Sequence, residues 1–414
     1  MRNTHAIAPI HHFAAVLLAC AGQSGAQLGL PGSLPALPTM GNLPGSVLGQ
    51  ANDLLEGTRQ QVAATLNLVR SQRIDTLLRD NRGAVERDSA GEPARRGVLL
   101  LVNPDAATLA QVTHLGFALG ATNELDGLGV SVSQITLPRG MSLAAAQKLL
   151  RQQAPAAQVA SDQIYFQSGG GGQGGSAARA SAAVAVYTPI GLIDGAAAQP
   201  VAATRGFAKG APLASNHGSA VAYLAQNAGA RRVMVADVYG ADPAGGNALA
   251  IAQGLGWLVS KGARVISISL VGPRNPLLER AVSAAQARGT AIVAAVGNDG
   301  PAAPPSYPAS YPGVLAVTVV DQRNRPLIEA GRAVHLDYAA PGADLSAQDR
   351  SGRLVAVRGT SFAAPLVAVR AAAALDAGAS LQSLVGLLDR EAQPLSRRRP
   401  DPQSGRGLLC AMCR

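Results

Sequence analysis

Apolar positions in the second half of the chain fall into short continuous runs that alternate with segments of helical spacing. Such runs are typical of strands buried on both faces, as in a parallel sheet covered by helices. The expected strands are residues 183–193, 232–238, 264–270, 291–296 and 314–320. The expected helices between them are residues 218–229, 245–261 and 276–288. The pattern predicts an α/β domain over residues 183–409, with a three-layer, doubly wound, mostly parallel sheet.

A second pattern, with shorter elements, covers residues 97–167. Its expected strands are residues 97–102, 129–137 and 158–166, and its expected helices are residues 104–119 and 142–153. This β-α-β-α-β order predicts a small α+β domain of the ferredoxin-like type. The run SGGGGQGG at 168–175 cannot form a core and begins a glycine-rich linker over residues 168–182. We interpret the linker as a domain boundary and a protease-accessible site.

The first residues have the pattern of an export signal. Arg2 precedes an apolar run at 13–19, which is shorter than the about 20 residues that cross a bilayer. We predict a signal peptide over residues 1–26, cleaved after Ala26. An alternative is the lipobox-like stretch Leu17-Leu18-Ala19-Cys20, in which Cys20 would carry a lipid anchor; an uncleaved, disordered N-terminus is a third. The protein is expected to be secreted or periplasmic in a bacterial cell envelope, or an outer-membrane lipoprotein through Cys20.

Residues 27–96 are expected to hold a flexible lead-in, rich in Gly, Pro and Leu, and then one packing helix at about 52–80. At the other end, residues 410–414 form a short tail with Cys410 and Cys413. A local disulfide or an incidental pair is favoured there over a zinc or redox site, because no second pair of ligands exists.

The composition excludes some classes of protein. With 48% hydrophobic and 14% charged residues, the chain is not expected to be mainly disordered. Its net charge of +10 invites a nucleic-acid partner, but the basic residues are almost all arginines scattered along the chain, and aromatic residues make up only 3%. Few rings are therefore left for base stacking, and no nucleic-acid partner is expected.

Four short stretches carry candidate chemistry. Asp194 ends an apolar strand in GLIDG, His217 opens a helix in NHGSAVA, and Ser361 follows a glycine turn in GTSFAAP. An acid, a histidine and a serine at strand ends and helix starts are the parts of a nucleophile–base–orienter relay. Asn298, in AAVGNDG after another strand, has an amide that can donate a hydrogen bond to a developing oxyanion.

In the order Asp, His, Ser and in the GTSFAAP stretch, the chain resembles the subtilisin-like serine proteases, or subtilases. The resemblance covers residues 183 to about 409 and includes VISISLVGP at 265–273 and DPQSGRGLL at 401–409. It implies that Asp194 orients the imidazole, that His217 is the general base and then the general acid, and that Ser361 is the nucleophile. Asn298 and the backbone N–H of Ser361 would form the oxyanion hole. The implied substrate-binding residues are Ser269, Leu270, Val271 and Gly272.

The resemblance also implies partners. Residues 97–167 resemble the subtilase propeptide, which chaperones and inhibits the enzyme. Its closing strand, residues 162–167, would approach the active site as a product does, and the linker would supply the site of self-cleavage. A protein or peptide substrate, a monomer and no organic cofactor are expected. Structural calcium is common in the family, but the chain has no D-x-[DN]-x-[DN]-G loop, so calcium ligands remain unassigned and no metal site is predicted.

Two positions depart from the family pattern. Val271 stands where subtilases usually have glycine, and its branched side chain is expected to narrow the pocket or block close backbone approach. Gly195 directly follows Asp194, where Thr or Ser is usual before the glycine.

The sequence predicts an exported serine endopeptidase made as a self-processing precursor. The alternatives are a catalytically silent subtilase fold that acts as a binding or assembly protein, and a permanently attached accessory domain in place of the propeptide. A lipase or esterase would need a G-x-S-x-G elbow, which the chain lacks. A dinucleotide-binding enzyme is disfavoured because SGGGGQGG has no strand–turn–helix setting.

Overall fold

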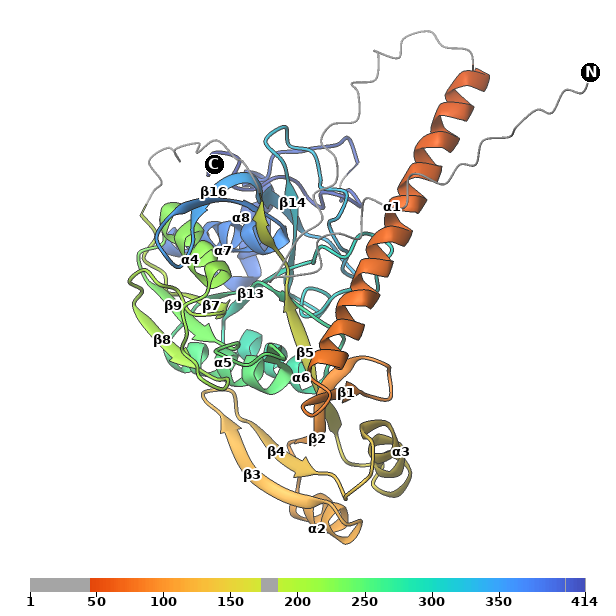
Figure 1. Ribbon diagram of the computed structural model, residues 1–414. Helices are drawn as coiled ribbons and strands as arrows, with labels where there is room; N and C mark the ends of the chain where they lie inside the picture. Colours follow the sequence, from red (N-terminus) through yellow and green to blue (C-terminus); the bar gives the residue numbers. More distant parts are fainter. Residues whose placement is uncertain (1–44, 173–184, 399, 414) are drawn as a thin grey trace, which may run out of the picture. The chain divides into compact units, whose positions relative to one another are not determined.

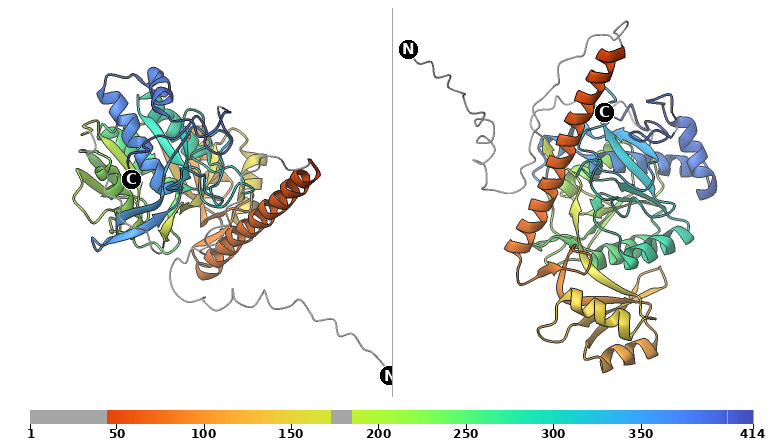
Figure 2. Two further views of the ribbon diagram at one scale, coloured as in Figure 1. Left: turned by 90° about the horizontal axis from the view of Figure 1, so that it is seen from above. Right: turned by 90° about the vertical axis from the view of Figure 1, so that its right-hand side faces the viewer.

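The computed structural model describes residues 45–172, 185–398 and 400–413 (Figure 1). The predictions for residues 1–44, among them the signal peptide and Cys20, lie outside the described residues, as does the linker after residue 172. A single helix of 36 residues, α1 (Gly45–Asp80), comes first and is unbroken in the two views of Figure 2. It begins earlier than the helix predicted at about 52–80.

An antiparallel sheet follows, built from β1 (Val85–Arg87), β2 (Pro93–Val102), β3 (Ala118–Leu125), β4 (Val130–Thr136) and β5 (Val159–Gln167). The strand order is β5-β2-β4-β3, with β1 on β2, and two helices accompany the sheet: α2 (Ala106–His114) and α3 (Leu143–Gln153). Apart from β1, the element order is β-α-β-β-α-β.

The predicted helix at 104–119 was wrong at its end, and one strand was missed. The helix stops at His114, and the strand β3 begins at Ala118. This strand lies at the edge of the sheet, and most of its residues are exposed. It therefore lacks the apolar alternation by which strands are recognised in a sequence.

The α/β domain contains a seven-stranded sheet in which all neighbouring strands are parallel. Its strands, in spatial order, are β15 (Tyr338–Pro341), β14 (Leu315–Val320), β13 (Ala291–Ala295), β11 (Val265–Ile268), β7 (Ile190–Asp194), β9 (Val233–Asp237) and β8 (Ala203–Gly206). The predicted doubly wound α/β architecture is confirmed. The edge strands β8 and β15, of four residues each, were not predicted because such short segments carry little pattern.

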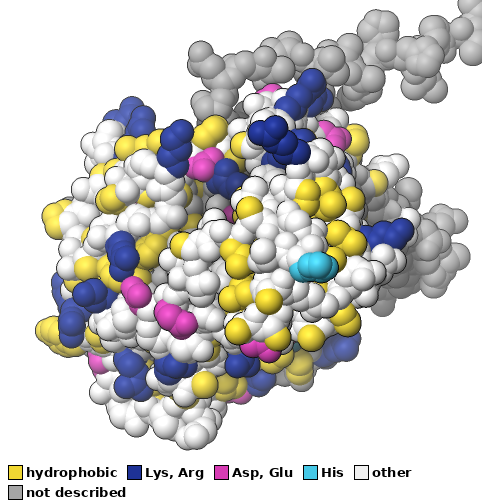
Figure 3. Space-filling view, turned by 90° about the horizontal axis from the view of Figure 1, so that it is seen from below, with side chains coloured by type: hydrophobic (Ala, Val, Ile, Leu, Met, Phe, Trp, Pro, Cys, Tyr) yellow, Lys and Arg dark blue, Asp and Glu magenta, His cyan; other side chains and the backbone are white. Residues whose placement is uncertain are grey.

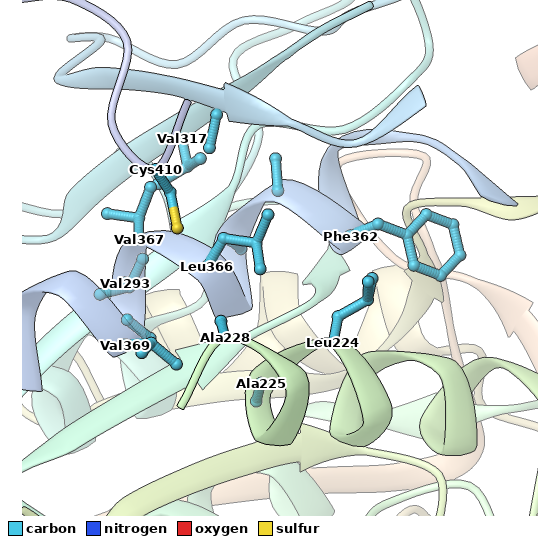
Figure 4. Close-up of a cluster of buried hydrophobic side chains, with 14 of the residues drawn as sticks. Leu224, Ala225, Ala228, Val293, Val317, Phe362, Leu366, Val367, Val369 and Cys410 are labelled. Atoms are coloured by element: carbon cyan, nitrogen blue, oxygen red, sulfur yellow. The ribbon is translucent and has the colours of Figure 1, made fainter. Parts of the chain in front are cut away.

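Helices cover both faces of this sheet. The helices α4 (Asn216–Asn227) and α7 (Thr360–Asp376) share one buried cluster, and α8 (Leu381–Glu391) packs on α7. On the other face lie α5 (Ala248–Ser260) and α6 (Pro276–Ala287). Figure 4 shows side chains of α4 and α7 gathered with sheet residues: Leu224, Ala225, Leu366, Val367, Val369, Val293 and Val317. The core thus holds the start of α7 firmly in place.

Side chains cap the N-termini of α4, α5 and α6, whereas α7 begins after Gly359 without a side-chain cap. Oγ of Ser215 accepts the N–H of Gly218 at the start of α4, and Oδ1 of Asn247 accepts the N–H of Ala250 in α5. Asn275 caps α6, whose first residue is Pro276. Caps of this kind satisfy backbone donors that the helix itself leaves unpaired.

A third, smaller sheet contains β16 (Ala343–Gln348), β17 (Leu354–Arg358) and the short strand β6 (Gly170–Gly172). Near the C-terminus, the stretch 401–409 makes only isolated bridges, such as Ala339 with Leu408, rather than a strand. Cys410 and Cys413 form a disulfide.

Figure 3 shows one face of the molecule, on which Lys and Arg side chains are spread among acidic and apolar ones rather than gathered in one patch. Within the described part of the chain, no single helix is long and apolar enough to cross a membrane. Only α7 and α8 taken together reach that length and apolar character, and the angle between them is 116°. The same residues contain no group of three or more His, Cys, Asp or Glu side chains that could hold a metal ion, so calcium ligands stay unassigned.

Candidate active site

Asp194, His217 and Ser361, which are far apart in the sequence, meet beyond the carboxyl end of β7. Nδ1 of His217 lies 2.8 Å from Oδ2 and 3.0 Å from Oδ1 of Asp194. On the other side of the ring, Nε2 lies 2.9 Å from Oγ of Ser361. All three residues are buried, and Asp194 is 1% exposed. This is the geometry of a nucleophile, a general base and a carboxylate that orients the base.

Close packing at the start of α4 brings His217 to Asp194. A Cβ on Gly218 would collide with the carbonyl oxygen of Gly195 and lie 2.9 Å from that of Ala196. Only glycine therefore lets the first turn of α4 approach the backbone that follows Asp194. The cap from Ser215 fixes the same turn, so the position of the imidazole is set by the backbone around it.

The turn before Ser361 also requires glycine. Gly359 has φ of 143°, and a Cβ there would lie 2.7 Å from Nδ2 of Asn298 and 2.8 Å from the carbonyl oxygen of Ser168. Ser361 is the second residue of α7, where backbone N–H groups have no partner within the helix and attract negative charge. Ser361 is therefore placed at a helix end that favours an oxyanion.

Asn298 follows β13 and faces the start of α7. Its Oδ1 accepts the N–H of Thr360 at 3.1 Å. Its Nδ2 is buried and has no hydrogen-bond partner among the described residues. The N–H of Ser361 donates to the carbonyl oxygen of Ser168 at 3.0 Å. Since oxyanion-hole donors are placed for the transition state rather than for the ground-state carbonyl, the free amide of Asn298 is suited to be the second donor.

The strand β5 of the α+β domain inserts between two short strands beside these residues. On one side, β10 (Gly246–Asn247) pairs antiparallel with residues 164–165; on the other, β12 (Leu270–Val271) pairs antiparallel with residues 166–167. Main-chain addition of this kind is how extended peptides bind to sheet edges. Of the two alternatives expected for Val271, blocked backbone approach was wrong, because its backbone pairs with Phe166, and a narrowed pocket stays a prediction.

The four residues expected to bind substrate all contact this segment. The carbonyl oxygen of Ser269 accepts the backbone N–H of Ser168 at 3.3 Å and its Oγ–H at 3.1 Å. Leu270 and Val271 form the strand pair. Gly272 lies against the ring of Tyr165, where a Cβ would be 2.6 Å from the ring carbons. The segment that ends at Ser168 therefore lies as an extended substrate would.

The peptide bond between Ser168 and Gly169 lies against the side chain of Ser361. Oγ of Ser361 is 2.5 Å from the carbonyl oxygen of Ser168, so its proton has this oxygen and Nε2 of His217 as acceptors in reach. A Cβ on Gly169 would collide with Oγ of Ser361 and lie 2.8 Å from Cε2 of Phe362. The space next to the nucleophile therefore fits glycine.

The glycine-rich stretch that we interpreted as a linker over residues 168–182 contains a short strand near its start. Residues 170–172 form β6, which pairs antiparallel with β17, with Gly170 opposite Arg358. Glycine contributes no side chain, so this pairing rests on backbone hydrogen bonds alone and leaves no pattern in the sequence. The chain is therefore bound on both sides of the Ser168–Gly169 bond.

Helix α1 contacts the loop of Asn298 and the strand β5 beside Ser361. Nη2 of Arg73 lies 3.0 Å from Oδ2 of Asp299, the residue after Asn298, and Nε of Arg70 lies 3.6 Å from the same oxygen. The guanidinium of Arg73 also stands 4.4 Å from the ring centre of Phe166 in β5. One arginine thus links α1 both to the loop of Asn298 and to the strand beside the nucleophile.

Asp162, also in β5, is a buried carboxyl group at the start of α5. Its Oδ1 accepts the N–H of Leu249 at 3.0 Å. Burial raises the pKa of Asp162 to about 6, with a further upward contribution from Asp242, although the Leu249 N–H and Arg95 favour the charged form. A carboxyl group whose pKa is raised by folding stabilises the folded chain below its ordinary pKa of 3.8, and this contribution is lost as the pH rises through about 6.

We expect Asp162→Asn to stabilise the uncleaved chain at neutral pH, because the amide keeps an acceptor for Leu249 and carries no charge. The free energy of unfolding should rise by about 2–3 kcal/mol at pH 7 and be nearly unchanged at pH 3.5, following about 1.4 kcal/mol per pKa unit. Urea unfolding of cleavage-inactive chains at several pH values measures this. Asp80→Asn, at the exposed end of α1, is the control. A less stable Asp162→Asn chain at pH 7 would contradict the prediction.

Sequence reasoning named the triad, Asn298 and the 269–272 segment, and the structure brings them together. It also placed the closing strand of the first domain, residues 162–167, at the active site, but it gave no individual role to Arg73, Asp162, Gln167 or Ser168. The only sequence signal for Ser168 is its place between a strand and a glycine run. Arg73 and Asp162 become special only through contacts with Asp299 and α5, which no local pattern reveals.

Comparison with known proteins agrees with this geometry. Residues 205–388 match the model of the subtilase family. The chain is 40% identical over 136 residues to subtilisin BL of Lederbergia lenta (33% of this chain, 50% of that protein) and 32% identical over 187 residues to thermitase of Thermoactinomyces vulgaris (45% and 65%). The chain thus spans about half to two thirds of the length of these relatives. Fervidolysin of Fervidobacterium pennivorans, a keratinolytic enzyme related to subtilisin, shares the fold, with a TM-score of 0.63 at 18% identity over 77% of this chain and 61% of that one.

Proposed function

The chain carries a domain of the subtilase family, and on that premise we propose that it is an exported serine endopeptidase made as a self-processing precursor. The observation that carries the proposal is the Ser168 carbonyl group held against Oγ of Ser361, which in turn lies 2.9 Å from Nε2 of His217. Export is supported by the sequence of residues 1–26 alone.

The proposed reaction follows from the positions of the atoms. Oγ of Ser361 attacks the carbonyl carbon of the scissile peptide bond while Nε2 of His217 takes its proton. The oxyanion that forms is stabilised by the N–H of Ser361 and by Nδ2 of Asn298. His217 then gives the proton to the departing amine, and water resolves the acyl-enzyme in the same manner. Asp194 keeps Nδ1–H of the imidazole oriented throughout.

Labelling with a fluorophosphonate tests this function. The expected result is one covalent adduct on Ser361 of the self-processed protein, located by peptide mass spectrometry, together with hydrolysis of peptide substrates. Correctly folded, processed protein that takes up no label would favour the catalytically silent fold acting in binding or assembly.

We propose that the first substrate is the chain's own Ser168–Gly169 bond, which is supported by the strand pairing on both sides of it. Residues 97–167 would then act as a propeptide, and the processed enzyme would begin at Gly169. The alternative of a permanently attached domain would leave this bond intact. N-terminal sequencing of the processed protein distinguishes the two.

We expect Gly169→Val to slow self-processing by at least about 10²-fold, because a side chain there collides with Oγ of Ser361 and approaches Phe362. The measurement is the rate at which full-length chain disappears on gels after synthesis. Gly83→Ala, which adds a methyl group with no described atom within 4 Å, is the matched control. Cleavage of the valine variant at the same bond and at the normal rate would contradict the assignment of this bond.

After cleavage, α1 is expected to hold the severed segment in place through Arg73. Arg73→Ala removes both the Asp299 ion pair and the stacking on Phe166, so the delay between processing and the appearance of peptidase activity should shorten several-fold. Gels and a fluorogenic peptide followed in parallel measure this delay. Arg79→Ala, which loses only a contact to Thr76 within the helix, should leave it unchanged. An equal delay in both variants would count against the role of Arg73.

A further inference from the structure

Asp194, the carboxylate of the triad, receives a hydrogen bond from the segment bound beside the nucleophile. Nε2 of Gln167 donates to Oδ1 of Asp194 at 3.2 Å. Gln167 precedes Ser168, so it is the second residue before the bond that lies at Ser361. The other described donors to this carboxylate are the N–H of Gly195 at 2.7 Å and Nδ1 of His217. A carboxylate has about four lone-pair sites, so Gln167 occupies one that the protein's own groups leave open.

The protein cannot easily supply this donor from the residue after Asp194. That residue is Gly195, and a Cβ on it would collide with Oγ of Ser215 and lie 2.9 Å from its Cβ. Ser215 caps the helix that carries His217, so it cannot move aside without disturbing the general base. A hydroxyl-bearing side chain at position 195 is therefore excluded while Ser215 is present.

Burial makes the open site consequential. With a segment bound beside the nucleophile, as in this chain, Asp194 is 1% exposed, so a lone pair that the bound segment leaves without a donor has little access to water. A buried polar atom without a partner is costly, and a hydrogen bond to a charged group is stronger than one between neutral groups. A segment with an amide at this position satisfies the carboxylate; an apolar side chain leaves the site open, and a carboxylate side chain places a second negative charge beside it.

From this arrangement we propose that the enzyme selects substrates with a side-chain amide, glutamine above all, at the second position before the cleaved bond, and that this amide positions Asp194 during the reaction. The inference rests on the proposed endopeptidase function and names a substrate class for it. The residues that determine the selectivity are Asp194, Gly195 and Ser215.

The test compares three fluorogenic peptides that span residues 161–172 and differ only at the position of Gln167. One keeps glutamine, one has methionine, which matches its length without a donor, and one has glutamate, which matches its shape and carries a charge. With the self-processed enzyme, we expect kcat/KM to fall by about tenfold for methionine and by about a hundredfold for glutamate. In the full chain, Gln167→Met and Gln167→Glu should slow self-processing in the same order.

A variant of the enzyme separates this effect from simple binding in the pocket. Ser215→Gly together with Gly195→Ser frees the space and adds a hydroxyl donor next to Asp194. Glycine is itself accepted at an N-cap at little cost, so the helix that carries His217 keeps its start. In that enzyme, the preference for glutamine over methionine should fall to within about twofold. A pocket that merely binds glutamine elsewhere would keep the full preference, and that result would overturn the proposal.

Fluorophosphonate labelling of the same preparations distinguishes the two proposals. Labelled enzyme that cleaves the glutamine and methionine peptides at equal rates overturns the amide preference and leaves the endopeptidase function standing. Folded protein that neither takes up label nor cleaves any peptide overturns both.

Discussion

Replacing Ser361 with alanine is expected to abolish peptide cleavage and to leave the chain at full length. In subtilisin, loss of the nucleophile lowers kcat by about 10⁶-fold, and we expect a loss of this size here. The physical reason is that Oγ of Ser361 is the atom in contact with both the Ser168 carbonyl group and Nε2 of His217. Without it, neither processing of the Ser168–Gly169 bond nor hydrolysis of other peptides can pass through an acyl-enzyme.

The measurement is gel analysis of the chain made in a host that lacks other proteases, with peptide hydrolysis assayed alongside. Ser361 is fully buried in α7, so the thermal unfolding of the variant should be recorded to show that it is folded. Ser71→Ala, which removes a hydroxyl from the exposed face of α1, is the control and should process normally. Processing of the Ser361→Ala chain at the Ser168–Gly169 bond in that host would end the self-cleavage hypothesis.

The parts of the site that sequence could predict are those whose chemistry is local. Asp194 ends a buried strand, His217 opens a capped helix and Ser361 follows a glycine turn, so each stands at a place where the backbone presents a side chain. The parallel sheet was predictable for a related reason, since most of its strands are continuous apolar runs buried on both faces. The length, the apolar character and the order of these runs were enough to predict the sheet.

The parts that sequence could not predict depend on contacts between distant segments. The glycines of β6 form a strand only because β17 offers its edge, and a run of glycine carries no periodicity. The exposed strand β3 is recognisable only by its partner β4. Nothing in the local sequence distinguishes Arg73 from the other arginines or Gln167 from other polar residues. Their roles follow from the contacts of Arg73 with Asp299 and of Gln167 with Asp194. Tertiary pairing, not local preference, gives these residues their roles.

Asn298 was predicted only in part. The sequence motif identified the residue, but only the structure shows that its amide nitrogen has no hydrogen-bond partner among the described residues. Its Oδ1 is held by the N–H of Thr360, whereas Nδ2 has no partner in the described part of the chain. A buried donor without a partner destabilises the folded state, so its presence indicates a role elsewhere in the reaction cycle. The tetrahedral intermediate, whose oxygen carries a full charge, is the species that such a donor would bind best.

We expect Asn298→Ala to lower kcat by about 10²–10³-fold, the range found for the corresponding donor in subtilisin, and to leave KM nearly unchanged. KM should hold because Nδ2 makes no hydrogen bond to the bound segment before attack. Asn298→Asp, which keeps an acceptor for Thr360 but replaces the donor with a carboxylate, should be at least as slow, so loss of the Thr360 contact cannot explain the effect. Steady-state kinetics on a fluorogenic peptide measure both constants, and Asn227→Ala, at the exposed end of α4, serves as the control. An unchanged kcat would remove Asn298 from the oxyanion hole and leave the backbone N–H of Ser361 as the donor that faces the developing charge.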